Sequence, residues 1–392
     1  MQSYTIVITE VDEADAALEE LEAQLSDIKL LRNTVGIVSV NPEFLHSGVY
    51  DAIAAAVPFP VVGITTYSQN ANGKIGTFLL SILVLTADDC EFAYGYSDAI
   101  PKEGDATKAT QECYKSIRAK LSGKVKLALL YSPYVTYLCT SDHINAISAL
   151  DATVPIYGSY AASELVAMGS STRTFCETSC FENRLVMLLI SGNISPAFYI
   201  GSVADSPPMI SNIGEVTDVE KNIVKTINNI KANKIFEKIG FSGGVVDDLG
   251  SITTVFIVNE KDKSGNLVPI AVRSLASLRD GVAVFGGHVP LGSYLSVAVT
   301  TKEVIVSTAR DTVSRINKEN KGKTALIYTC LGRVIALLDE PMLEYEIINE
   351  SMAGNDVNYI VASSGGEICP TSVTEARVYN DEHDQTLVAC VF

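Results

Sequence analysis

Blocks of apolar and polar positions follow one another in an order that occurs three times along the chain. The first occurrence opens with an apolar run at 35–40 and continues with apolar runs at 60–67 and 78–85. Runs of this length predict buried strands. Between the first two runs, apolar residues four positions apart predict one face of a helix. These residues are Leu45, Val49, Ile53 and Val57.

Two later segments repeat this order of strand, helix, strand, glycine-bearing turn and strand. Their apolar runs are at 126–133, 154–163 and 184–190 in the second segment, and at 325–333, 359–370 and 386–392 in the third. The helices between the runs are marked by Ile144, Ile147 and Leu150, and by Leu343 and Ile347. We therefore predict an α/β fold of two domains built on this recurring unit, while the strand order stays open.

Other patterns predict elements between these segments. Apolar residues recur at helical spacing in 11–31 and in 105–121. Thr217 and Glu220 match a capping box, which predicts that a helix carrying Ile223, Ile227 and Ile230 begins there.

Alternating apolar positions separated by polar turns from 251 to 308 predict an antiparallel meander. The last predicted strand of this meander is EVIVST at 303–308. The C-terminal half therefore adds α+β elements to the fold. Ser206 is followed by the proline pair Pro207-Pro208, at which few elements continue, so we expect the domain boundary there.

Length, composition and charge exclude several classes of protein. The 392 residues suffice for two or three domains, and 47% hydrophobic residues is ordinary for a globular protein. No apolar run reaches the roughly 18 residues that span a bilayer. The N-terminus lacks the pattern of a secretion signal, so we expect a cytoplasmic protein. A net charge of −17 argues against nucleic acid and anionic membranes as partners.

Some of these stretches resemble the FIST domain pair, named for F-box and intracellular signal transduction proteins. The stretches that resemble the N-terminal FIST domain are 58–68 and 81–92, and those that resemble the C-terminal one are 268–299 and 363–370. The resemblance implies a FIST N-terminal domain at 1–206 that contains two of the α/β units. It implies a FIST C-terminal domain at 207–392 that contains the meander and the third unit.

The resemblance also implies a function in signal transduction. It implies a sensory module that binds a small ligand, such as an amino acid or a similar metabolite, and is not an enzyme. One branch of the family binds haem to sense nitric oxide, so a haem sensor is an alternative, and an enzyme of unrecognised mechanism is another. The sequence shows no output segment of its own. We therefore expect the signal to pass to a separate partner protein or through a homo-oligomer.

Small and hydroxyl-bearing residues follow the middle strand of each unit and are the candidate ligand site. In open α/β sheets, ligands favour the crevice beyond the carboxyl ends of strands, where exposed N–H groups and hydroxyls serve as donors. The candidates are Thr65, Thr66, Ser159, Ser363, Ser364, Gly365, Gly366, Glu367 and Arg333. Arg333 and Glu367 would clamp the two ends of a zwitterion, or else pair with each other.

Histidines and cysteines offer few other sites. Of the four histidines, His46 and His143 fall on predicted helices and are expected to be solvated, whereas His288 lies in a glycine-rich turn. His288 is the candidate axial ligand in the haem alternative. No sequence context supports a nucleophile activated by histidine. The eight cysteines are expected to be reduced, and we predict no metal site.

Overall fold

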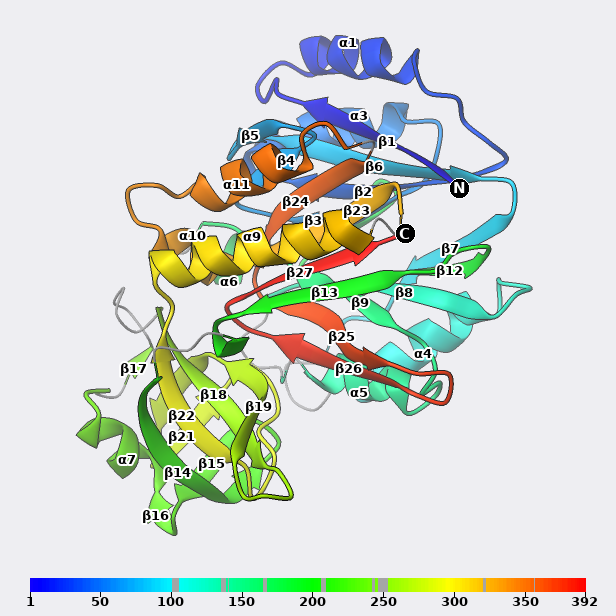
Figure 1. Cartoon of the computed structure of the whole chain (residues 1–392). Helices are drawn as coiled ribbons and strands as arrows, with labels where there is room; N and C mark the ends of the chain where they lie inside the picture. Colours follow the sequence, from blue (N-terminus) through cyan, green and yellow to red (C-terminus); the bar gives the residue numbers. More distant parts are fainter. Residues whose placement is uncertain are drawn as a thin grey trace.

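The computed structural model describes residues 1–100, 106–134, 139, 141–164, 168–205, 209–241, 244–245, 253–319, 322–355 and 357–392 (Figure 1). Helices and strands alternate through most of this part of the chain, and the sheets contain both parallel and antiparallel pairs. The predicted α/β class is therefore confirmed. The boundary expected at Ser206 falls on residues outside the described ones, so the division at 206 stays a prediction.

Three six-stranded sheets form the main body of the described chain. The first contains, in order, β1 (Gln2–Ile8), β6 (Leu80–Ala87), β2 (Asn33–Val40), β3 (Val61–Thr65), β10 (Thr174–Cys176) and β11 (Ser179–Phe181). The second contains β26 (Val378–His383), β25 (Glu367–Val373), β9 (Ile156–Tyr160), β8 (Val125–Ser132), β12 (Val186–Gly192) and β7 (Cys90–Tyr96). The third contains β13 (Ala197–Ser202), β27 (Thr386–Val391), β23 (Thr324–Cys330), β24 (Asn358–Ser364), β4 (Gln69–Ala71) and β5 (Lys74–Gly76).

The three sheets share one plan. Each has a central parallel pair, which is β2 with β3, β8 with β9, or β23 with β24. An antiparallel strand lies on one side of this pair, and a hairpin lies on the other. The hairpin always comes from a different segment of the chain: β10–β11 joins the first sheet, β25–β26 the second and β4–β5 the third. Each hairpin therefore ties two sheets together.

Apolar residues from all three sheets meet in one central core. Ile37, Leu129 and Leu326 belong to this core and come from β2, β8 and β23. The hydroxyl of Tyr157 donates to the backbone carbonyls of Leu326 and Val388, at 2.7 and 3.1 Å. The buried hydroxyl of Tyr157, in the second sheet, thus finds its hydrogen-bond acceptors in the third sheet.

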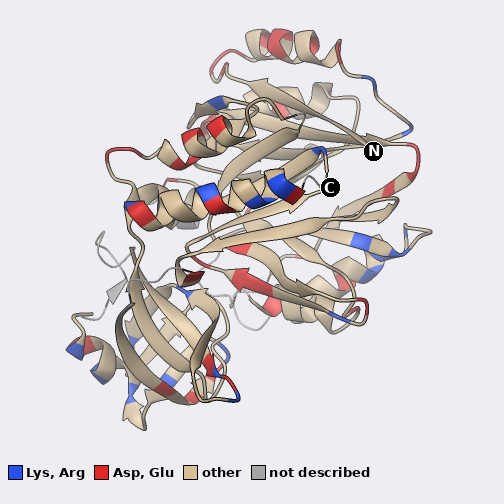
Figure 2. Cartoon of the chain, in the orientation of Figure 1, with Lys and Arg blue, Asp and Glu red and all other residues tan. Residues whose placement is uncertain are grey.

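Helices cover the outer faces of the sheets (Figure 1). The first sheet is covered by α1 (Ala14–Leu25), α2 (Glu43–His46) and α3 (Val49–Ala56). The second is covered by α4 (Thr107–Arg118) and α5 (Ser141–Ser148), and the third by α9 (Lys302–Glu319), α10 (Leu331–Ala336) and α11 (Leu343–Met352). Acidic residues are prominent on α1 and α11 (Figure 2).

A separate antiparallel domain spans 209–299 and lies between β13 and α9 in the sequence. Its strands are β14 (Met209–Glu220), β15 (Ile223–Ile227), β16 (Ile230–Lys231), β17 (Gly244–Val245), β18 (Thr254–Lys261), β19 (Leu267–Arg273), β20 (Leu275–Arg279), β21 (Val282–Phe285) and β22 (Tyr294–Val299). One helix, α7 (Ala232–Lys238), packs against it through Phe236. The antiparallel strands predicted from 251 onwards are present up to β22, but they do not form a meander, because β22 pairs with β14 and β18 and not with β21.

Two predicted elements were wrong. The stretch 303–308 begins α9, because Val304, Ile305, Thr308 and Ala309 bury one helical face, and this outweighs the local strand preference. Thr217 and Glu220 belong to β14, and the residues after them form β15 of a hairpin.

The predicted α/β elements are otherwise present with small changes. The helix predicted between Leu45 and Val57 is divided into α2 and α3 at Gly48, whose φ is +81°. The strand expected at 325–333 ends at Cys330, so Arg333 lies in α10. The helices predicted at 11–31 and 105–121 are α1 and α4. Small sheet strands β4 and β10 were not anticipated as separate elements.

The glycines of the first two middle strands lie within the strands. A Cβ on Gly63 would lie 1.9 Å from the backbone oxygen of Val38, and one on Gly158 would lie 1.9 Å from that of Leu130. Val38 and Leu130 are the partners of these glycines on the neighbouring parallel strands. Close packing of the two backbones therefore requires glycine at both positions.

Candidate functional site

The ends of the middle strands meet near the junction of the three sheets. The hydroxyl of Thr66, just after β3, lies 2.9 Å from the hydroxyl of Ser363 in β24. Ser363 Oγ also accepts the backbone N–H groups of Tyr67 and Ser68. Thr65 binds the hairpin of the second segment, since its N–H donates to the carbonyl of Arg173 at 3.0 Å. All of these contacts join segments that are far apart in sequence.

A second group of candidates lies between β9 and β24. Ser159 Oγ is 2.8 Å from Ser364 Oγ, and Ser364 in turn donates to the carbonyl of Gly366 at 2.6 Å. Gly365 donates its N–H to the carbonyl of Tyr160, whose own N–H donates to the carbonyl of Gly366. Gly366 has a φ of +151°, which side chains rarely adopt. The predicted hydroxyl and glycine residues therefore come together in one buried network.

Glu367 is a buried carboxyl group in this network. Its Oε2 accepts the hydroxyl of Thr386 at 2.7 Å and the N–H of the same residue at 3.3 Å. Its Oε1 is buried and has no hydrogen-bond partner among the described residues. Burial raises the pKa of Glu367 well above its usual value, which favours the protonated form of the group. The buried Oε1 is able to accept a hydrogen bond from a donor of a ligand.

The corresponding positions in the other two sheets have a different chemistry. Gln69 and Thr174 are, like Glu367, the first residues of the hairpin strands β4 and β10. Gln69 Nε2 donates to the carbonyl of Leu79, and Thr174 Oγ1 donates to that of Arg184. Glu367 instead accepts from Thr386. Among these three equivalent positions, only Glu367, in the hairpin of the second sheet, carries a carboxyl group.

Two further carboxyl groups lie shortly before β27, Glu382 at the end of β26 and Asp384 in the turn that follows it. Glu382 and Asp384 are both buried, and burial raises the pKa of Asp384. Asp384 Oδ2 accepts the N–H of Ser274 in the antiparallel domain at 2.8 Å. A Cβ on Gly366 would lie 3.5 Å from Glu382 Oε1, so the Glu382 carboxylate is next to the glycine turn. Acidic groups therefore line one side of the network.

Arg273 of β19 brings a buried positive charge from the antiparallel domain. Its Nη1 donates to the carbonyl of Glu382 at 2.6 Å and lies 3.6 Å from Glu382 Oε2. Its Nη2 is 3.1 Å from Asp381 Oδ1, and its Nε donates to the carbonyl of His288. A Cβ on Gly287 would lie 2.2 Å from Glu382 Oε2, so a larger residue there would displace the Glu382 carboxylate. These charges hold the antiparallel domain against the main body.

Arg333 pairs with Glu344 and not with Glu367. Arg333 Nη2 is 2.6 Å from Glu344 Oε1, and the side chains of both residues are completely buried. Further donors of Arg333 reach Thr308 Oγ1 at 2.9 Å and the carbonyl of Gln385 at 3.4 Å. Arg333 is thus linked to the network around Glu367 only indirectly, through Gln385, which precedes Thr386.

The histidines differ in environment. His143, expected to be solvated, is fully buried and lies 2.8 Å from Thr110 Oγ1 and 3.2 Å from Ser132 Oγ, so this prediction was wrong. Burial lowers the pKa of His143 to about 4. The error arose because α4 covers the face of α5 that carries His143. His288 Nε2 lies 3.4 Å from Asp142 Oδ1. The prediction for His46 fits its exposed side chain.

Sequence reasoning missed Arg273, Glu382 and Asp384. They reach the site from β19, from the end of β26 and from the turn after it, and only the fold brings these segments together. Two signals were nevertheless present. The stretch NDEHDQ at 380–385 places polar residues next to an apolar strand, and Arg273 interrupts an apolar run. A charged residue inside an apolar run predicts a buried partner.

Comparison with known protein families decides the classification. The FIST N domain matches residues 34–230, and the FIST C domain matches residues 250–370. The chain belongs to the FIST family. FIST domains are generally regarded as small-ligand sensory domains in signal transduction. The predicted resemblance is confirmed, and the family favours a sensory function without an enzymatic activity.

Other comparisons add little to this assignment. The crystal structure of cyanuric acid hydrolase from A. caulinodans aligns with 99% of this FIST protein and 98% of that chain, at 10% sequence identity and a TM-score of 0.30. This similarity is too low to support a conclusion about activity. Among curated proteins there is no match. No helix within the described ranges is long and apolar enough to cross a membrane.

Proposed function

We propose that this FIST protein senses a small molecule with an ammonium group, such as an amino acid, at the network around Glu367. The observation that carries the proposal is the buried Glu367 carboxyl group, which has one oxygen held by Thr386 and the other without a partner among the described residues. An ammonium group is a strong donor to such an oxygen, and its charge would favour ionisation of the acid.

The surrounding groups suit the other end of an amino acid. Hydroxyls of Thr65, Thr66, Ser159, Ser363 and Ser364 and the N–H groups of Gly365 and Gly366 are donors that a carboxylate would accept. Thr66, Ser159, Ser363, Ser364 and Gly366 now bind one another, while Thr65 binds Arg173 and Gly365 binds Tyr160. Ligand binding would therefore exchange contacts within the network for contacts with the ligand.

Arg333 has a positioning role in this proposal. Its guanidinium group is engaged by Glu344, Thr308 and the Gln385 carbonyl, so direct contact with a ligand would break a buried ion pair. By holding the Gln385 carbonyl, Arg333 fixes the start of β27. The adjoining Thr386 then orients Glu367.

The same network offers a route for the signal. Asp384 and Glu382 contact the antiparallel domain through Ser274 and Arg273. A ligand that binds beside these carboxyl groups would change their charge balance and so the contact between the domain and the main body. A separate partner protein or a second copy of the chain would detect that change.

The surroundings of His288 favour this small polar ligand over haem. The imidazole lies against Asp142 Oδ1 and Asn145 Nδ2, at 3.4 and 3.3 Å. A haem group needs an extended apolar pocket, whereas these neighbours are polar. Ser132 Oγ lies 3.2 Å from His143 Nε2, but both side chains are completely buried, so this pair gives the enzyme alternative no accessible nucleophile.

Thermal unfolding in the presence of single amino acids and small amines tests the proposal. Binding stabilises by about 2.7 kcal/mol at a ligand concentration one hundred times Kd, which is readily measured. The variant Glu367→Gln should fold and lose the shift, because an amide cannot neutralise an ammonium group. Glu346→Gln, an exposed change on α11, is the matched control and should keep it. A full shift with Glu367→Gln would place the ligand elsewhere, and no shift with any compound would reject the proposal.

A further inference from the structure

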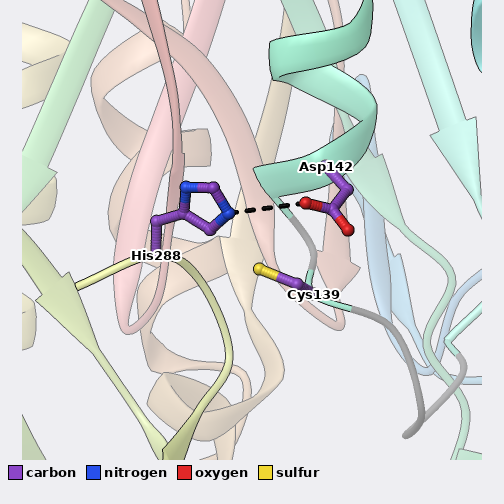
Figure 3. A group of neighbouring side chains, drawn as sticks. All are labelled: Cys139, Asp142 and His288. Carbon is purple, nitrogen blue, oxygen red and sulfur yellow. Dashed lines mark ion pairs between the residues drawn. The ribbon is translucent and has the colours of Figure 1, made fainter. Parts of the chain in front are cut away.

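Three side chains with metal-binding atoms converge where the antiparallel domain meets α5. Cys139 precedes α5, Asp142 lies in its first turn, and His288 comes from the connection between β21 and β22. One sulfur, oxygen or nitrogen atom of each residue lies within 4.8 Å of those of the other two. Figure 3 shows the three side chains directed towards one another.

The spacing suits one small metal ion. Atoms bound to the same tetrahedral zinc ion lie about 3–4 Å apart, given metal bonds of about 2.0–2.3 Å. His288 Nε2 and Asp142 Oδ1 are already 3.4 Å apart. A small inward movement of the Cys139 side chain would complete a set of one thiolate, one carboxylate and one imidazole, which leaves a fourth position for water or an external ligand.

Neighbouring groups hold the carboxylate and the imidazole in binding orientations. Lys221 Nζ donates to Asp142 Oδ2 at 2.9 Å, which leaves Oδ1 as the oxygen that faces His288. At the other ring nitrogen, Asn145 Nδ2 lies 3.3 Å from His288 Nδ1. The His288 backbone N–H donates to Ser141 Oγ at 3.0 Å, which ties the histidine loop to the start of α5. Such outer contacts fix the orientation of metal ligands.

The surroundings of His288 Nε2 and of the Cys139 thiol are those expected of metal ligands. His288 Nε2 is buried and, apart from its ion pair with Asp142 Oδ1, has no hydrogen-bond partner among the described residues. Cys139 is buried beside a charged carboxylate, although a structural thiol is normally surrounded by apolar groups. A His288–Asp142 ion pair alone would explain the imidazole but not the third residue. A metal ion explains all three.

We propose that Cys139, Asp142 and His288 bind a divalent transition metal of the zinc type. On binding, the metal displaces the proton of the Cys139 thiol, which passes to solvent, and bonds form to the sulfur, to Asp142 Oδ1 and to His288 Nε2. Because His288 belongs to the antiparallel domain and the other two ligands to the main body, the ion fastens the domain to α5. None of the three ligands belongs to the network around Glu367, although Arg273 contacts both the carbonyl of His288 and that of Glu382.

Cobalt substitution of the full chain tests the site. After treatment with a chelator, Co²⁺ titration should give the near-ultraviolet band of a cobalt–thiolate bond, saturating at one ion per chain, and Zn²⁺ should remove it. Cys139→Ser should lose the band, and His288→Ala should weaken cobalt binding about tenfold or more. The matched controls are Cys180→Ser, an exposed thiol on β11, and His46→Ala, an exposed imidazole on α2.

Each outcome decides the question. A band that persists in Cys139→Ser, or one that disappears in Cys180→Ser, overturns the assignment, and so does the absence of any band in the wild-type chain. Circular dichroism establishes that each variant is folded. If folded Asp142→Asn binds cobalt as tightly as the wild type, the carboxylate is not a ligand and the proposed set is wrong. Glu367→Gln should bind cobalt normally, so failure of the ligand-sensing proposal is distinguishable from failure of this one.

Discussion

Arg333 Nη2 and Glu344 Oε1 are 2.6 Å apart in an ion pair from which solvent is completely excluded. The pair joins α10 to α11, and Thr329 of β23 also donates to Glu344. A buried charge without its partner is costly, whereas an apolar pair of similar volume is often tolerated. The stability of the third sheet and its helices therefore depends on Arg333 and Glu344 being present together.

Arg333→Ala should lower the free energy of unfolding by about 3–5 kcal/mol, because it leaves the Glu344 carboxylate buried and unpaired. The double variant Arg333→Met/Glu344→Leu should recover most of that loss, since both charges are removed. Urea denaturation of the two variants and the wild type gives the comparison. Equal losses for the single and the double variant would show that the charge of Glu344 is not the cause.

Glu367→Gln should change the pH dependence of stability. The pKa of Glu367 is raised in the folded protein, so its neutral form stabilises the fold at low pH, and that stability is lost as pH rises above the ordinary value of 4.5. Glutamine does not ionise. The variant should therefore gain on the wild type by about 1 kcal/mol or more between pH 5 and pH 8, as measured by urea denaturation at each pH. A difference that does not grow with pH would contradict the raised pKa.

His383 should contribute acid sensitivity. Burial lowers its pKa below the usual value of 6.5, and its Nε2 lies 3.1 Å from the carbonyl of Cys369. The unfolded chain binds the proton more readily, so stability should fall as pH drops below 6.5. His383→Gln keeps a side-chain donor and should reduce the slope by up to about 1.4 kcal/mol per pH unit. Denaturation at pH 5 and pH 7 measures it, and an unchanged slope would argue against a neutral buried imidazole.

Gly63→Ala and Gly158→Ala should each destabilise the body by about 3 kcal/mol, because the new methyl group would overlap a backbone oxygen of the adjacent strand. Gly76→Ala is the matched control. Its Cβ would meet Leu79 Cγ at an ordinary 3.8 Å, so we expect a change within about 0.5 kcal/mol. Thermal unfolding separates the cases, and a similar result at all three positions would reject the packing argument.

Much of the body was predictable because its elements carry strong local signals. Val35–Val40 and Phe78–Leu85 are apolar enough to indicate buried strands, and both overlap strands of the first sheet. Helix α11 follows from Leu343 and Ile347. Whether the three segments descend from one repeated sequence stays a prediction. The pattern of sheets does not decide this.

The remaining errors have physical causes. The β-branched residues at 303–308 favour a strand locally, but the buried face formed with Thr312 and Val313 makes them helical. Of the candidate site, the hydroxyl and glycine residues were recognisable because they follow apolar strands. Arg273 and Asp384 were not, since their proximity depends on the packing of the antiparallel domain against β26 and β27. Pairing of Arg333 with Glu344 likewise required the positions of α10 and α11.

The hairpin that each sheet receives from another segment has a consequence for biosynthesis. The second sheet, whose own strands end at residue 192, requires β25 and β26, and the third places β27 between β13 and β23. Neither sheet is complete until the residues up to about 390 have left the ribosome. The strands synthesised earlier therefore keep unpaired apolar edges exposed during synthesis. The many long-range pairings should also make folding slow. A chaperone that shields nascent strands is therefore expected to increase the yield of this protein.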